Sequence, residues 1–456
     1  MVLSVSSSPA AVPIQGRSYT KPIIVIIGLA AIAALLLYVA KSLHGRITIL
    51  DPETLINQGK GLLKEEKYAE AVDKFTAALR CNPADRLLKA QILYHRGLAY
   101  NSLHEYGKAI DDLTIALKYS FQNQELHARI YRLRGDVYFD QDDLEKTLEN
   151  YNQGLACKTS REFKVNFLLA RIEVYLRQNE FALALDETTA LLRIDSLNST
   201  TRGAVCLQRG NAQMGLGDSL EAIKNFNIAI ESLPPDISPV YVLSQRAQAY
   251  FAQENFDEAI RDLTTALETD LENEGLKAIM VCQRGFAHSH LKHYQEAIED
   301  FNETFKHIPL DEPYLYIRIE RALCFIENDT SDLAIVDMRH ALDHESSAQN
   351  QVIILLILGR AYAKQTQYER AVENYTAALE LNPTDQDKKS ELLYFRGVVK
   401  QEQKKLEEAA KDWQAALNCD PSDKNLREAI ESKLKGDSLV PGPTLWSKLR
   451  QKLPFS

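Results

Sequence analysis

Apolar and small side chains recur along residues 52–423 in a pattern that repeats every 37 or 38 residues. The clearest copy, residues 94–117, places Gly97, Tyr100, Ala109 and Leu113 at helical spacing. Ten residues mark the copies when the chain is aligned on Ala109: Ala71, Ala109, Thr147, Ala184, Ala222, Ala259, Ala297, Ala334, Ala371 and Ala409. A period of this length predicts a solenoid in which each repeat is a pair of helices.

Each copy predicts two helices that pack closely. The eighth position of the copy is Gly or Ala in nine cases of ten, and a bulky residue such as Phe75 or Trp413 follows on the second helix. Five prolines end the second helix: Pro83, Pro234, Pro309, Pro383 and Pro421. The sequence therefore predicts an all-α fold.

The order of small, aromatic, Ala, aromatic, Ala and Pro positions in ten copies resembles the tetratricopeptide repeat family, over about four-fifths of the chain. The resemblance implies a right-handed superhelical solenoid of about ten helix pairs that binds proteins or peptides. The period is three or four residues longer than the family's usual 34. The fourth repeat departs further, with Ile172, Thr188 and Leu191 at normally small or aromatic places.

An uncharged apolar stretch at residues 23–40 is long enough, as a helix, to cross a bilayer. A cleaved signal peptide is the alternative, but the run is longer than usual and no good cleavage site follows it. The flanking charges give no orientation. The expected organisation is a disordered stub at 1–21, a transmembrane anchor at 22–41, a linker at 42–51, ten repeats at 52–423, a capping helix at 424–435 and a basic tail at 436–456.

Charge is unevenly distributed. The net charge is −10, yet both ends are basic, so the body between them is strongly acidic. An acidic body disfavours nucleic acid as the partner, because phosphate binding needs a basic surface. The six cysteines form no CxxC pair and indicate free thiols rather than a disulfide or zinc framework.

The first helices of repeats six to nine carry large apolar groups where helical periodicity predicts the concave side. These positions favour a peptide-binding groove for an apolar or amphipathic segment. The expected peptide-binding residues are Tyr241, Phe251, Ile279, Phe286, Tyr316, Ile319, Leu323, Ile326, Leu356 and Arg360. The alternative is that the same side chains pack against neighbouring helices, and both interpretations stay open.

Two further patterns carry other predictions. An arginine precedes the eighth position in eight repeats, with a polar or acidic residue sixteen positions on, which predicts structural ion pairs between paired helices. The family's clamp for chaperone C-terminal tails needs Lys and Asn on three first helices. The matching places hold Ile56, Lys60, His95, Arg129 and Leu133. Binding of chaperone tails is therefore not expected.

No motif indicates catalysis. The chain has no nucleophile elbow, phosphate-binding loop or dinucleotide-binding glycine pattern, and the pair His340 and His344 lacks a third ligand. His288, His290 and His293 likewise form no metal-site pattern. We therefore expect no enzyme activity, cofactor or metal.

The tail repeats leucine every four residues at Leu445, Leu449 and Leu453, beside Trp446 and three cations. Residues 444–456 thus predict a short amphipathic helix for a membrane interface or a partner, with a frayed terminus as the alternative.

The architecture resembles membrane-anchored receptors of the family, such as the mitochondrial outer-membrane import receptor. It implies a single-pass protein of the mitochondrial outer membrane or endoplasmic reticulum, with a cytosolic solenoid, that binds a client segment in protein import or complex assembly. The alternative is a co-chaperone or assembly factor of the endoplasmic reticulum, although the His-Pro-Asp tripeptide of a J domain is absent.

Overall fold

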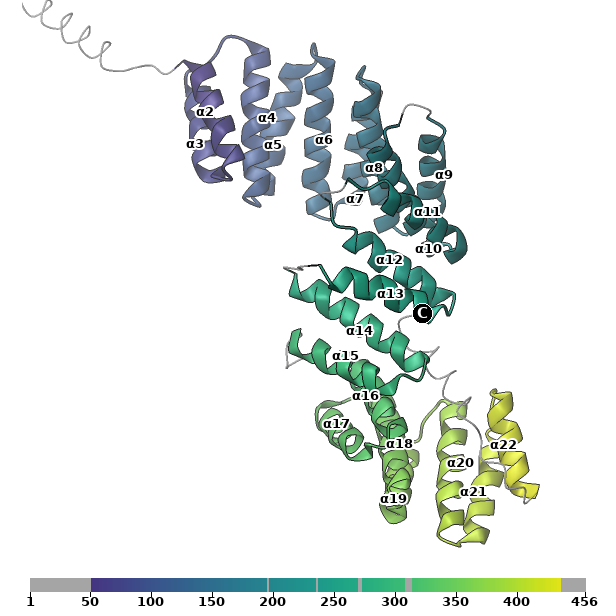
Figure 1. The fold of residues 1–456 in the computed structure, drawn as a ribbon. Helices are drawn as coiled ribbons and strands as arrows, with labels where there is room; N and C mark the ends of the chain where they lie inside the picture. Colours follow the sequence, from purple (N-terminus) through teal and green to yellow (C-terminus); the bar gives the residue numbers. More distant parts are fainter. Residues whose placement is uncertain (1–50, 195–196, 235–236, 270–272, 308–313, 436–456) are drawn as a thin grey trace, which may run out of the picture. The chain divides into compact units, whose positions relative to one another are not determined.

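The computed structural model describes residues 51–194, 197–234, 237–269, 273–307 and 314–435, and every regular element in them is an α-helix (Figure 1). The chain divides into two bodies, residues 1–164 and 165–456, which are described separately. The first body holds α2 (Pro52–Lys64), α3 (Tyr68–Arg80), α4 (Arg86–Ser102), α5 (Tyr106–Ser120), α6 (Gln124–Asp140), α7 (Leu144–Ala156) and the start of α8 (Arg161–Arg177).

The second body begins within α8 and contains fourteen further helices. They are α9 (Phe181–Leu192), α10 (Ser199–Gly215), α11 (Ser219–Glu231), α12 (Val240–Ala252), α13 (Phe256–Leu267), α14 (Glu274–His290), α15 (Tyr294–His307), α16 (Leu315–Glu327), α17 (Ser331–His344), α18 (Ala348–Lys364), α19 (Tyr368–Glu380), α20 (Gln386–Glu402), α21 (Leu406–Asn418) and α22 (Lys424–Lys435).

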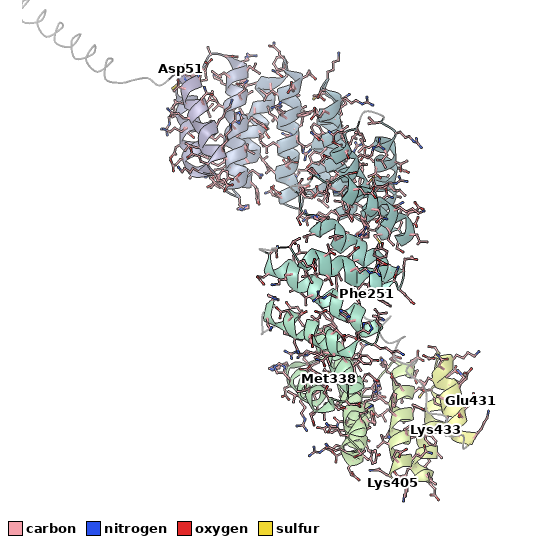
Figure 2. All side chains as sticks on the ribbon, in the orientation of Figure 1. Asp51, Phe251, Met338, Lys405, Glu431 and Lys433 are labelled. Carbon is pink, nitrogen blue, oxygen red and sulfur yellow. The ribbon has the colours of Figure 1, made fainter. Side chains whose placement is uncertain are left out.

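Consecutive helices pack in pairs, α2 with α3 through α20 with α21, and α22 covers α21 at the end of the second body. Side chains radiate from every helix, so the core lies between pairs rather than at one centre (Figure 2). An all-α solenoid of 21 helices among the described residues agrees with the helical part of the sequence prediction.

The two helices of a pair approach closely because small residues face bulky ones. A Cβ atom added to Gly210 on α10 would lie 2.5 Å from the ring of Phe226 on α11. Gly135 and Tyr151 are related in the same way on α6 and α7. The glycine at the eighth position is thus set by the ring that fills the space between its pair of helices.

All ten turns within pairs contain a residue in the left-handed region, with φ between 55° and 80°. The position is Gly217 in the fifth repeat and a side-chain-bearing residue in the other nine. These are Glu66, His104, Asp142, Asn179, Glu254, Lys292, Asp329, Thr366 and Lys404. The turn therefore has a similar backbone conformation in all ten pairs despite its varied sequence.

The prediction of a transmembrane helix is corrected. Within the described ranges, no helix is both long and apolar enough to cross a membrane. Residues 23–40, on which that prediction was based, lie outside these ranges, as do the predicted stub and tail. The same finding overturns the predicted localisation as a single-pass protein of the mitochondrial outer membrane or endoplasmic reticulum.

Candidate functional site

The ten predicted peptide-binding residues all lie on first helices of the second body, but they differ sharply in exposure. Four are buried, with exposed fractions of 5% or less: Ile319, Leu323, Ile326 and Leu356. They belong to one core cluster in which α16 packs directly against α14 and α18. These four side chains are packed in the core of this structure, as the packing alternative describes, and they present little surface to a partner.

Two of the ten are well exposed. Tyr241 on α12 is 51% exposed and Ile279 on α14 is 52% exposed, and they occupy the same position in successive repeats. An exposed aromatic and an exposed β-branched side chain at matching places are the accessible part of the predicted surface.

An aromatic stack adjoins Ile279. The ring of Phe286 on α14 lies nearly parallel to that of Tyr316 on α16, with centroids 6.2 Å apart, and meets Phe301 on α15 edge-on at 5.2 Å. Ile279 is seven residues before Phe286, so both lie on one face of α14. We call Ile279, Phe286 and Tyr316 the α14–α16 patch.

The α14–α16 patch carries no charge. Burial raises the pKa of the Tyr316 phenol to about 12, with smaller contributions from Cys282 and Tyr314. Burial likewise raises the pKa of the Cys282 thiol to about 12. The phenol is therefore a neutral hydrogen-bonding group near pH 7, and Cys282 is a neutral apolar filler rather than a nucleophile.

Phe251 belongs to a different cluster. Its ring meets Phe256 at 5.3 Å, and Phe256 stacks on His290 at 4.4 Å. These contacts tie the turn between α12 and α13 to the end of α14. Phe251 therefore supports the pair from within and is only partly accessible.

Arg360 on α18 is a link between helices rather than an open anchor. Its side chain is largely buried and donates to Glu327 of α16 at 3.2 Å, and its guanidinium lies over the ring of Phe395 on α20. Burial lowers the pKa of Arg360 to about 10, although the negative charge of Glu327 acts to raise it. Burial also raises the pKa of the neighbouring Glu391 carboxyl. Arg360 thus joins three first helices through charge and stacking.

The predicted arginine ion pairs are present and reach further than the sequence indicated. In five repeats the guanidinium bonds both oxygens of the aspartate sixteen residues on: Arg96, Arg246, Arg284, Arg321 and Arg396. Its remaining nitrogen donates to a Thr or Asn on the second helix of the preceding repeat, as Arg246 does to Asn227. In these five repeats the arginine therefore links its own helix pair to the preceding repeat.

Arg209 in the fifth repeat breaks this pattern. Its Nε is buried with no hydrogen-bond partner among the described residues. Asn225, sixteen residues on, is instead paired with Gln213 at 2.8 Å.

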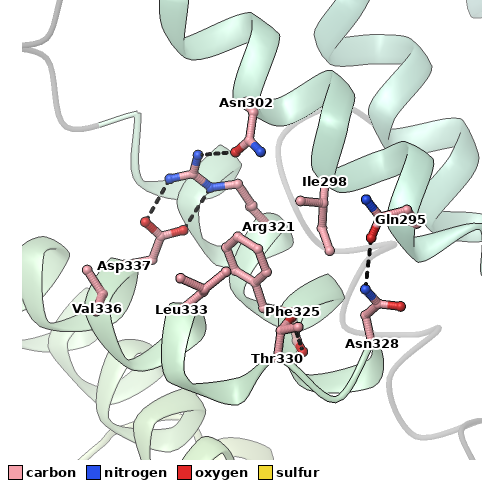
Figure 3. A pocket seen from close by; sticks show the side chains of 10 residues that line it. All are labelled: Gln295, Ile298, Asn302, Arg321, Phe325, Asn328, Thr330, Leu333, Val336 and Asp337. Carbon is pink, nitrogen blue, oxygen red and sulfur yellow. Dashed lines mark hydrogen bonds and ion pairs between the residues drawn. The ribbon is translucent and has the colours of Figure 1, made fainter.

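A pocket that the sequence analysis missed lies on the second-helix side, between α15, α16 and α17 (Figure 3). Its volume is about 400 Å³, and its apolar lining includes Ile298, Phe325, Leu333 and Val336. Leu333 and Val336 are exposed on α17, at places where the repeat pattern does not call for a packing residue. Those two exposed apolar positions were the available sequence signal.

The histidines provide pairs of rings rather than a ligand set. The rings of His288 and His293 are 5.8 Å apart, and those of His340 and His344 are 4.7 Å apart. Over the part of the chain that the structure describes, no group of three His, Cys, Asp or Glu residues could hold a metal ion.

Comparisons with known proteins point to one kind of repeat. Two models described as tetratricopeptide repeat match the chain, one at residues 56–113 and 244–306 and the other at 352–385. Among curated proteins, the mouse DnaJ homolog subfamily C member 7 is 25% identical over 177 residues, and its human counterpart is 23% identical over 201 residues. The matches cover 36% and 41% of this chain, and the chain spans only 34% and 38% of the length of these relatives.

Solved structures of repeat proteins are also similar. The C-terminal part of a repeat protein from Cytophaga hutchinsonii is 15% identical with a TM-score of 0.45, and the match covers 57% of this chain and 98% of that one. A tetratricopeptide repeat protein from Parabacteroides merdae is 17% identical with a TM-score of 0.39, covering 58% and 97%. These matches do not support the resemblance to a mitochondrial import receptor.

Proposed function

We propose that this chain, which contains tetratricopeptide repeats, is a protein-interaction scaffold that binds a protein segment on the first helices of its second body. The observation that carries the proposal is the exposure of Tyr241 and Ile279, with the stacked rings of Phe286 and Tyr316 following Ile279 on the same face of α14. A partner's apolar side chain can cover Ile279 and extend the aromatic stack. The neutral Tyr316 phenol can hydrogen-bond to the partner's backbone.

The size of the effect follows from the exposed area. Fully burying an isoleucine side chain contributes about 1.5–3 kcal/mol, and about half of the Ile279 surface remains to be buried. Covering Ile279 is therefore worth about 1 kcal/mol, and introducing a charge there adds a desolvation cost on top. We expect Ile279→Asp to weaken binding at least about tenfold, which corresponds to about 1.4 kcal/mol.

A peptide library displayed on phage supplies the partner for the test. Peptides selected on the intact chain are synthesised and titrated calorimetrically against Ile279→Asp and Tyr241→Asp, and both variants should lose most of their affinity. The matched control is Ile228→Asp, which replaces another exposed isoleucine on the second helix α11 and should bind as the parent does. Selected peptides that bind Ile279→Asp and Tyr241→Asp unchanged would refute this site.

The finer role we propose is assembly of protein complexes or delivery of a client. A second candidate is a co-chaperone, because the curated relatives are named DnaJ homologs. A scaffold binds one class of folded partner or defined peptide, whereas a co-chaperone suppresses aggregation of many unfolded chains. Light scattering of a heat-unfolded enzyme, with and without the chain and its Ile279→Asp variant, separates the two.

A further inference from the structure

The pocket between α15, α16 and α17 is a second surface, separate from the α14–α16 patch and independent of the function proposed above (Figure 3). Ile298 of α15 and Phe325 of α16 are nearly buried at its base. Leu333 and Val336 of α17 stand at its mouth with 50% and 64% of their surface exposed. Such a pocket, of about 400 Å³, fits one or two large apolar side chains.

The surroundings of the α15–α17 pocket are acidic. The two second helices α15 and α17 together carry seven Asp and Glu residues against one Lys and one Arg. Arg321, which lines the pocket, is already bound by Asp337 and Asn302. Glu299 and Asp332 remain exposed nearby. The pocket therefore favours an apolar segment that also carries positive charge.

The chain contains a segment with those properties just after its last described helix. Residues 444–456 combine the leucine repeat of Leu445, Leu449 and Leu453 with Trp446. Three cations, Lys448, Arg450 and Lys452, accompany them. As a helix, this segment would present the three leucines along one side.

We propose that the α15–α17 pocket binds the chain's own C-terminal segment, residues 444–456, which inserts Trp446 and one leucine of its leucine face, with the three cations facing the acidic side chains of α15 and α17. The segment is tethered to the same body as the pocket. Lys433, near the end of α22, donates to Gln401 of α20, so the last described turn of the chain lies against the last helix pair.

The tether spans this distance when it is extended. Packed helices lie about 8–10 Å apart, so the few helix layers between α22 and α17 amount to roughly 30 Å. The eight residues 436–443 that precede the segment span up to about 29 Å when extended. A nearly extended tether gives an effective concentration below the millimolar value of a relaxed short linker, so docking depends on the contacts that the segment makes in the pocket.

The test follows the fluorescence of Trp446 in the intact chain carrying Trp413→Phe, so that the tail holds the remaining tryptophan. If half or more of the tails are docked, acrylamide quenching of Trp446 should be at least about twofold weaker than in a free peptide of residues 437–456. In the Leu333→Asp variant of this chain, acrylamide should quench Trp446 as strongly as it does in the free peptide. The control is Leu183→Asp, at the same repeat position on α9 and similarly exposed, and it should leave Trp446 protected.

A second measurement needs no change at Trp413. Carbodiimide treatment of the unmodified chain should join Lys448 or Lys452 to Glu299 or Asp332, as detected by mass spectrometry of the monomer band. Cross-linking and Trp446 protection should be independent of protein concentration and should weaken in high salt. Protection that grows with concentration would assign the pocket to a second copy and overturn the proposal. Free quenching of Trp446 in the intact chain, or protection that survives Leu333→Asp, would also overturn it.

Discussion

Arg246 joins three helices and provides the sharpest test of what holds neighbouring repeats together. Its Nε and Nη2 donate to the two carboxylate oxygens of Asp262 at 2.7 and 2.6 Å, and its Nη1 donates to Asn227 at 2.6 Å. The bonds link α12 to α13 in its own pair and to α11 in the preceding one. The side chains of Arg246 and Asp262 are only 19% and 8% exposed, so water screens the pair weakly.

Asp262→Ala removes two charge-assisted hydrogen bonds and leaves the guanidinium largely buried without its counter-charge. Removing one partner of a buried ion pair lowers the free energy of unfolding by about 3–5 kcal/mol. Because Arg246 keeps some exposure to water, we expect a loss of about 3 kcal/mol here. The double variant Arg246→Met with Asp262→Leu removes both charges together, and we expect it to cost about 1 kcal/mol or less. The double variant should then be about 2 kcal/mol more stable than Asp262→Ala, because it leaves no buried charge without a partner.

Hydrogen exchange measured by mass spectrometry is the suitable assay, because a repeat array unfolds locally and one global transition does not describe it. Amides of α11, α12 and α13 should exchange about 100-fold faster in Asp262→Ala, since each 1.4 kcal/mol corresponds to a factor of ten. Amides of the first body, residues 51–164, should be unchanged and serve as the internal reference. The double variant should restore most of the lost protection.

The matched control is Arg209→Met in the fifth repeat. Because the Nε of Arg209 has no partner among the described residues, this variant should be neutral or slightly stabilising. Equal effects of Asp262→Ala and the double variant would contradict the reasoning, because they would show no coupling. A loss of about 3 kcal/mol in Arg209→Met would also contradict the reasoning, because the stabilisation would then not depend on the bidentate pairing of arginine with aspartate.

Two further predictions concern helix contact and protonation. Gly210→Ala places a Cβ 2.5 Å from the Phe226 ring and should lower the free energy of unfolding by about 1–3 kcal/mol through overpacking. In Gly61→Ala the added Cβ meets no atom within 4 Å, so this variant should stabilise α2 by up to about 1 kcal/mol. Urea melts measure both changes. Burial, with Lys60 and Arg129 nearby, lowers the pKa of His95 to about 4. As the pH falls, His95 therefore takes up a proton in the unfolded chain before it does so in the folded chain. The free energy of unfolding that neutral His95 contributes above pH 6.5 is lost as the pH falls toward 4, and the loss is about 3 kcal/mol. His95→Phe should flatten this dependence in melts followed across that range, and a slope identical to the parent's would contradict the assignment.

The sequence predicted the repeat packing from local chemistry. The spacing of Ala109 and its nine counterparts, with small residues opposite large rings, anticipated the paired helices observed throughout the described ranges. The arginine pairs were equally predictable, because residues sixteen positions apart recur on paired helices. Their third bond, to the preceding repeat, was not anticipated, since it depends on how two repeats stack.

The exposure of the candidate site could not be read from the sequence. Ile279 and Ile319 are both predicted to lie on the same face of their first helices, yet Ile279 is half exposed and Ile319 is buried. The difference arises because α16 packs against α18 as well as α14, so its face is covered by neighbouring side chains. Periodicity gives the direction in which a side chain points, but it does not give the distance to the next helix.

The sequence by itself determined which residues pair helices and which positions must be small, because these depend on contacts within one repeat. Only the tertiary structure decided which apolar side chains remain open. It closed the surface around Ile319 and Leu356, left Tyr241 and Ile279 accessible, and formed a pocket beside Leu333. The physical reason is that burial is a property of the space between repeats, which varies along the stack while the repeat pattern stays almost constant.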